Sequence, residues 1–207
     1  MKYQTQNLLY LLFTSVLFQT AIANENAYFT KPTALLTSGT DDKQEECIGN
    51  IGSVYSSLQS KDCQLIEEET DEGSGYSLES CPGVGGFTLE VADSDQRMTV
   101  TIVGPDNQKH PLNFYQVVTP YFSHLGDKAE WRIKKCGAKN IPIALIVRVY
   151  ANDQGDPYKT TSYLTVSKIT PQAFCVTAKI NPSSKQNIAA RVAADRAADS
   201  PCLGHFE

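Results

Sequence analysis

The alternation of hydrophobic and polar residues along the chain predicts a protein built mostly from short β-strands. Residues 75–91 show it best: a Pro-Gly turn at Cys81 precedes a strand that places Phe87, Leu89 and Val91 on one face. We expect this stretch to set the register of a β-sheet. The strand candidates share short length and flanking turn residues; they are 53–58, 63–68, 75–80, 87–92, 97–103, 130–135, 141–150, 160–169 and 173–180. Residues 141–150 are almost continuously apolar, which is typical of a central strand buried on both faces.

One helix is predicted close to the C-terminus. Ser183 can cap it with Gln186 three residues later, and 199–201 end it. The face expected to pack on a sheet is apolar; its residues are Ile188, Ala189, Val192, Ala193 and Ala197. The charged residues expected on the opposite face are Arg191, Asp195 and Arg196. Many short strands followed by one helix predict an α+β fold, a mostly antiparallel β meander (sheet, sandwich or barrel-like) with a C-terminal helix.

The N-terminal residues predict export. Lys2 precedes an apolar run at 8–18, and Ala21-Ile22-Ala23 is a typical cleavage signature, so residues 1–23 are a predicted signal peptide cleaved after Ala23. The run is too short to span a bilayer, and no membrane insertion is expected after cleavage. Residues 24–46 are polar and acidic, typical of a flexible lead-in, and 47–207 form a single predicted β-rich domain.

Composition narrows the classes of partner. The chain carries 23 acidic and 18 basic residues, for a net charge of −5, and it has no basic block. This charge balance argues against nucleic acid or anionic lipid as a partner. A periplasmic or secreted protein is the expected partner instead, and the sequence leaves the oligomeric state open.

The six cysteines predict a disulfide framework, because the number is even and the chain is exported. Sequence alone does not choose among the fifteen possible pairings. We favour Cys63–Cys81, which would tie the Pro-Gly turn to an earlier strand, and Cys175–Cys202, which would close a strand–helix unit. There is no Cys-x-x-Cys pair, so no metal site is predicted.

No grouping of residues demands catalysis or a cofactor. The histidines (His110, His124 and His205) are scattered outside recognised motifs, and we expect them to be solvated. The acidic run 67–72 lacks the spacing of a calcium loop and is typical of a solvated loop. Any two acidic residues, for example Glu90 and Glu130, could form a carboxylate pair, but the sequence selects none. We therefore predict a protein that is not an enzyme.

The most aromatic part of the chain is 112–122. We expect it to form a strand and a loop that cover one end of the core. The alternative is a recognition surface for another protein, centred on Tyr121 and Phe122, because aromatic side chains supply a large contact area at little entropy cost.

Several short motifs occur together from residue 53 onwards. They are Ser53-Val54-Tyr55, Cys81-Pro82-Gly83-Val84-Gly85-Gly86, Glu130-Trp131-Arg132, Phe174-Cys175-Val176 and Ala194-Asp195 ahead of Cys202. In these the chain resembles a group of uncharacterised exported proteobacterial proteins. The resemblance implies a core of four cysteines, Cys63, Cys81, Cys175 and Cys202, and no activity. Cys47 and Cys136 depart from that pattern, and their joint addition favours a third bridge between them.

Ser74-Gly75-Tyr76 is similar to part of the Ser-Gly-x-x-Tyr motif of bacterial periplasmic lysozyme inhibitors, although here the tyrosine directly follows the glycine. These observations predict an exported, non-catalytic binding protein of the bacterial periplasm. Its specific form would be inhibition of a cell-wall hydrolase through the loop 73–76. The alternatives are an envelope hydrolase with an unrecognised carboxylate pair, and a structural component of an envelope assembly that docks through 114–122.

Overall fold

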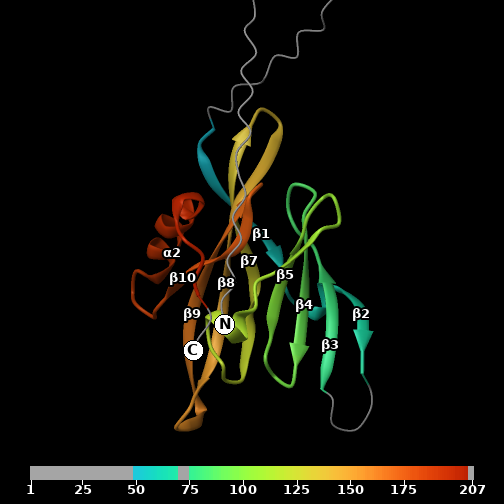
Figure 1. Ribbon diagram of the computed structural model, residues 1–207, viewed down its shortest axis with the longest axis vertical. Helices are drawn as coiled ribbons and strands as arrows, with labels where there is room; N and C mark the ends of the chain where they lie inside the picture. The colour runs from blue at the N-terminus through green and yellow to red at the C-terminus, as the bar shows by residue number, and fades with distance from the viewer. Residues whose placement is uncertain (1–48, 70–74, 205–207) are drawn as a thin grey trace, which may run out of the picture. The chain divides into compact units, whose positions relative to one another are not determined.

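The computed structural model describes residues 49–69 and 75–204, and within them it shows two five-stranded antiparallel sheets. Sheet A has the strand order β1 (Ile51–Ser57), β7 (Ser123–Cys136), β8 (Lys139–Asp153), β9 (Asp156–Thr170), β10 (Ala173–Ile180). Sheet B has the order β2 (Gln64–Glu68), β3 (Tyr76–Cys81), β4 (Thr88–Ser94), β5 (Thr99–Val103), β6 (Lys109–Pro111). The helices are α1 (Phe114–Val117), α2 (Gln186–Asp195) and two short 3₁₀ turns, Ser60–Asp62 and Ala197–Asp199. The predicted α+β fold, with its antiparallel meander and C-terminal helix, is confirmed (Figure 1).

Some predictions concern residues outside this description. They are the signal peptide 1–23, the lead-in 24–46, Cys47, Ser74 and His205. No helix among the described residues combines the length and the apolar character needed to cross a bilayer.

The inner faces of the two sheets share one hydrophobic core, so the fold is a β-sandwich. Sheet B contributes Leu89 and Ile102, and sheet A contributes Leu145 and Trp131, all fully buried. The indole Nε1 of Trp131 donates a hydrogen bond to Ser56 Oγ at 2.9 Å, which satisfies its one polar group inside the core. Alternate residues on each strand therefore point outward, and on sheet A the helix α2 covers part of that outer face.

The strand predictions are largely confirmed, with two corrections. β8 lies in the middle of sheet A, as the apolar run 141–150 predicts. Residues 112–122 hold the short helix α1 instead of a strand, entered through Asn113 in a left-handed conformation (φ 50°). Phe114 and Val118 are nevertheless fully buried at one end of the core, as expected. β6 was not predicted, since three residues offer too short a pattern to detect.

Two of the three favoured disulfides are present. Cys63 bonds Cys81, which joins the residue before β2 to the end of β3, and Cys175 bonds Cys202, which ties β10 to the segment after α2. The third favoured bridge involves Cys47, which lies outside the described residues, and Cys136 is not a free thiol. Each bridge stabilises the fold mainly by restricting the unfolded chain.

The predicted packing face of α2 is only partly right, since Ala193 and Ala197 pack on the sheet but Ile188, Ala189 and Val192 are exposed. Ile188 and Val192 are 60% and 50% exposed, and the helix instead buries Gln186, Ala190 and Ala194. Small alanines let the helix backbone approach the outer face of sheet A, where they contact buried apolar residues of β8 and β9; these are Ala144, Ile146, Leu164 and Val166. Ser183 does not cap the helix. The N-cap residue is Lys185, whose side chain makes no capping hydrogen bond.

Two charged residues that were expected on the solvent side of α2 form ion pairs with the sheet instead. Arg191 Nε bonds Glu130 Oε1 at 2.6 Å, and Arg132 Nε bonds Asp195 Oδ1 at 2.7 Å. The hydroxyl of Ser53 bonds both Glu130 and Arg132 and so links the two ion pairs. The outer face of sheet A is polar at this point, so it attracts the charged side of the helix.

We predict that Glu130→Gln destabilises the protein at neutral pH and not in acid. Burial raises the pKa of Glu130, but hydrogen bonds from Arg191 and Ser53 outweigh this effect and hold the pKa below the usual value of a glutamate. A carboxyl group whose pKa is lower in the folded than in the unfolded state stabilises the fold at pH values above its unfolded-state pKa. This stabilisation is lost as the pH falls through the folded-state pKa. Since Arg191 is partly exposed, we expect a loss of about 1 kcal/mol at pH 7.

Urea unfolding of both proteins at pH 7 and at pH 3 measures this difference. The matched control is Glu90→Gln on the outer face of sheet B, whose carboxylate pairs with the exposed Lys109. Equal losses for Glu130→Gln at both pH values would contradict the prediction.

Candidate protein-binding surface

Four loop segments meet at one end of the sandwich, the lower end in Figure 1, and we call this the loop surface. It comprises 75–76, 95–97, 118–122 and 152–154. Backbone hydrogen bonds connect them in sequence: Asp95 N donates to Gly75 O at 3.1 Å, Ser123 N to Gln96 O at 2.7 Å, and Asn152 N to Phe122 O at 2.9 Å. Segments far apart in the chain are thereby held side by side.

Two aromatic side chains project from the loop surface, each fixed by a polar neighbour. Tyr121 and Phe122 are 38% and 39% exposed. The hydroxyl of Tyr121 donates to Gln154 Oε1 at 2.7 Å. The guanidinium of Arg97 lies 4.6 Å from the centre of the Phe122 ring, and its Nη1 also bonds Asp95 Oδ2 at 2.6 Å. Because these rings are already held in place, a partner would bind them at a small cost in entropy.

Open depressions lie beside Tyr121, with volumes of 440 Å³ and 340 Å³. They share Pro120, Tyr121, Asn152, Asp153 and Gln154 as lining residues. The larger one continues towards Tyr163 and Lys179, and the smaller one towards Arg97 and Phe122. The surface therefore has the form of aromatic ridges between hollows, which suits complementary side chains of a partner protein.

The larger depression carries charges of both signs. Burial lowers the pKa of Lys179, whose Nζ donates to the carbonyl of Val118 and lies 4.1 Å from the Tyr163 ring centre. Hydrogen bonds from Thr161 and Lys159 lower the pKa of Asp153. Mixed charge of this kind suits a protein better than a uniformly charged polymer.

The turn between β4 and β5 has an unusual backbone. Asp95 and Gln96 both have positive φ angles, 51° and 58°, and Arg97 N bonds Ser94 O at 3.1 Å. This is the pattern of a type I′ turn, which normally uses asparagine and glycine. Two non-glycine residues in this conformation are strained, and strain of this kind concentrates at functional sites.

The structure brings the two predicted binding stretches to the same end. Gly75, with φ 53°, adjoins Asp95, and Tyr76 begins β3 opposite Ser94. Arg97 then connects this turn to Phe122. Sequence reasoning missed Arg97 and Gln154, because nothing in the local pattern shows which distant ring or hydroxyl they contact.

Other predicted chemistry is not assembled. Glu90 and Glu130 lie on the outer faces of different sheets, each paired with a cation, so they form no carboxylate pair. His110 is half-buried and stacks on Phe174 at 3.8 Å, so the prediction that it is solvated is wrong. His124 is exposed and stacks on Tyr150 at 4.9 Å.

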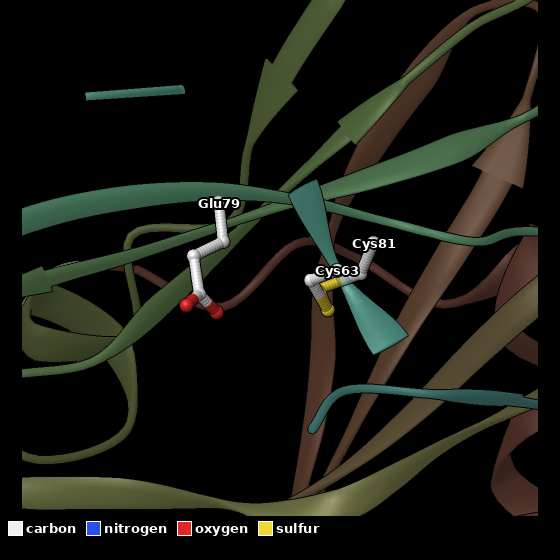
Figure 2. Close-up of side chains that lie close together, drawn as sticks. All are labelled: Cys63, Glu79 and Cys81. Carbon is white, nitrogen blue, oxygen red and sulfur yellow. A yellow bond between two sulfur atoms is a disulfide. The ribbon is translucent and has the colours of Figure 1, made fainter. Parts of the chain in front are cut away.

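One cluster has ligand types that bind metals. Candidate ligand atoms of Cys63, Glu79 and Cys81 lie within 4.8 Å of one another. Figure 2 shows the two sulfurs bonded to each other, with the carboxylate of Glu79 beside them. Metals bind cysteine as the thiolate, and a disulfide has none, so this cluster does not form a thiolate metal site.

Comparison of the chain with known protein families, with curated proteins and with solved structures found no match.

We predict that Asp93→Asn stabilises the protein at neutral pH. Burial raises the pKa of Asp93, and hydrogen bonds from the backbone of Gln96 and Arg97 offset this rise only in part. Its Oδ1 atom is buried without a hydrogen-bond partner among the described residues. A carboxyl group whose pKa is higher in the folded than in the unfolded state lowers the free energy of unfolding as the pH rises through the folded-state pKa. Asparagine keeps an acceptor and carries no charge, so we expect a gain of up to about 1 kcal/mol at pH 7.

Thermal and urea unfolding from pH 3 to pH 7 measures this difference. The gain in stability of Asp93→Asn should disappear near pH 3. Asp127→Asn serves as the control at an exposed position of β7. A loss of stability for Asp93→Asn at pH 7 would show that the carboxylate stabilises the turn.

Proposed function

We propose that this chain is an exported, non-catalytic binding protein of the bacterial periplasm, and that it binds another protein through the loop surface. Export is supported by the predicted signal peptide and by the disulfides, which form in oxidising compartments. The observation that carries the binding role is the exposed pair Tyr121 and Phe122, held by Gln154 and Arg97.

The composition of the loop surface supports a protein as the ligand. Tyrosine and arginine are among the residues that most often dominate the energy of protein interfaces, and here Tyr121 and Arg97 both line the smaller depression. The neighbouring strained turn supports the same role, because its conformation is maintained although it costs stability.

The specific partner we propose is a cell-wall hydrolase, which this protein would inhibit. Gly75 and Tyr76 adjoin the Asp95–Arg97 turn, so an enzyme seated on Tyr121 and Phe122 would also approach the predicted inhibitory loop 73–76. That loop would then enter or cover the active-site cleft of the enzyme, while the aromatic pair anchors the complex.

We predict that the double variant Tyr121→Ser, Phe122→Ser loses its partner. The experiment is a cross-linked pull-down from periplasmic extract, with the oxidised mature protein (residues 24–207) as bait. Removal of two aromatic anchors should weaken binding roughly thirtyfold or more, with the fold unchanged by circular dichroism. Capture of the same partner in equal yield would contradict the loop surface as the binding site.

Ile141→Ser is the matched control. Ile141 is 44% exposed and lies at the start of β8, at the opposite end of that strand from Asn152. Its removal deletes exposed apolar surface away from the loop surface and should leave capture unchanged.

A second pair of substitutions tests the inhibitory role. Ser74→Ala with Tyr76→Ala should reduce inhibition of the captured hydrolase while the aromatic pair preserves part of the binding. Unchanged inhibition would remove loop 73–76 from the site and leave the aromatic anchor as the proposed contact.

A further inference from the structure

A second concave site lies between α2 and the outer face of sheet A, and it shares no residue with the loop surface. This cleft has a volume of 170 Å³, enough for one small organic group. Antiparallel register places Tyr55, Glu130 and Ile146 side by side across β1, β7 and β8. Asn187 and Arg191, one helical turn apart on α2, close the cleft from above.

The lining combines an apolar floor with a cationic rim. Ile146 and Leu164 are both buried and form the apolar part. The rim has three cations, Lys128, Arg148 and Arg191, against one carboxylate, Glu130. The cleft therefore has an excess of positive charge on a chain whose net charge is −5.

The three cations differ in the number of hydrogen bonds that they make to other residues of the protein. Arg148 bonds Ser162, Gln186 and Asn187, which holds its guanidinium at the mouth of the cleft. Arg191 bonds Glu130 and Tyr55 through Nε and Nη2, so these bonds do not use its Nη1. The side chain of Lys128 is exposed and has no hydrogen-bond or ion-pair partner within the described residues. N–H donors of Lys128 and Arg191 are thus available to bind an anion.

We infer that this cleft binds a carboxylate ligand bearing a short apolar group, as in a free short-chain carboxylic acid or the C-terminal residue of a peptide. The carboxylate lies between Lys128, Arg148 and Arg191, where guanidinium groups match its geometry. The apolar group lies on Ile146 and Leu164 and removes their remaining surface from water. Glu130 limits the affinity by competing for Arg191.

The test is a ¹H–¹⁵N NMR titration of the oxidised mature protein with isovalerate, with N-acetyl-Gly-Gly-Leu, and with isovaleramide as the neutral analogue. We expect saturable shifts of the Asn187 and Arg191 amides with one or both carboxylates, and binding of isovaleramide at least about tenfold weaker. Tighter binding of isovalerate would identify a free acid as the ligand class, and tighter binding of the peptide would identify a chain terminus.

Variants locate the site. Lys128→Gln should weaken carboxylate binding about threefold to fivefold, since it removes one exposed charge, and Glu130→Gln should strengthen it. Lys135→Gln, an equal charge change at another exposed position of β7, should have no effect. The Lys128 side chain bonds no described residue, so its replacement should leave the fold intact, as circular dichroism would verify.

Three results would overturn the inference. Equal binding of isovaleramide would show that the carboxylate is not recognised. Inorganic phosphate binding as tightly as isovalerate would indicate an adventitious ion only, without use of the apolar floor. Full affinity in Lys128→Gln together with unchanged affinity in Glu130→Gln would place the ligand elsewhere.

Discussion

The burial of one face of each sheet against the other is the constraint on which the rest of this structure depends. Trp131 occupies the core with its indole nitrogen satisfied by Ser56, which joins β7 to β1 by a side-chain bond as well as by the backbone ladder. Once the inner faces are set, the period of two sends every alternate residue outward. Both candidate binding sites consist of side chains that this alternation, or the ends of the strands, leave outside the core.

The outer face of sheet A is a direct consequence of that constraint. Its residues on β1, β7 and β8 include Ser53, Glu130 and Arg148, so α2 cannot dock there by hydrophobic contact alone. The helix approaches through alanines and is oriented by Arg191 and Asp195, which find opposite charges on the sheet. This arrangement leaves Ile188 and Val192 in solvent and leaves a cationic cleft beside the helix. A helix with larger apolar residues on its packed side would fill that cleft.

The loop surface arises differently, from connections between strands. The turns after β4 and β8 and the segment before β7 come together because both sheets end there, and three backbone hydrogen bonds hold them in place. Arg97 and Gln154 acquire their roles only through this convergence, since their partners Phe122 and Tyr121 are distant in sequence. The left-handed residues Asp95 and Gln96 position Arg97 over the ring at some cost to stability.

By itself, the sequence determined most of the strands, the central place of 141–150 and the presence of a C-terminal helix, because hydrophobic period and turn residues are local signals. It favoured two disulfide pairs that the structure contains, although the number of cysteines alone allows fifteen pairings. It also indicated Tyr121 and Phe122 through their aromatic character. Only the tertiary structure decided which side of α2 faces the sheet. Hydrophobic periodicity assumes an apolar counterpart along the whole helix, whereas the face that α2 meets is apolar on β8 and β9 but charged on β7. The grouping of Gly75, Arg97 and Phe122, and that of Lys128, Arg148 and Arg191, likewise depends on contacts between distant segments, which no local pattern encodes.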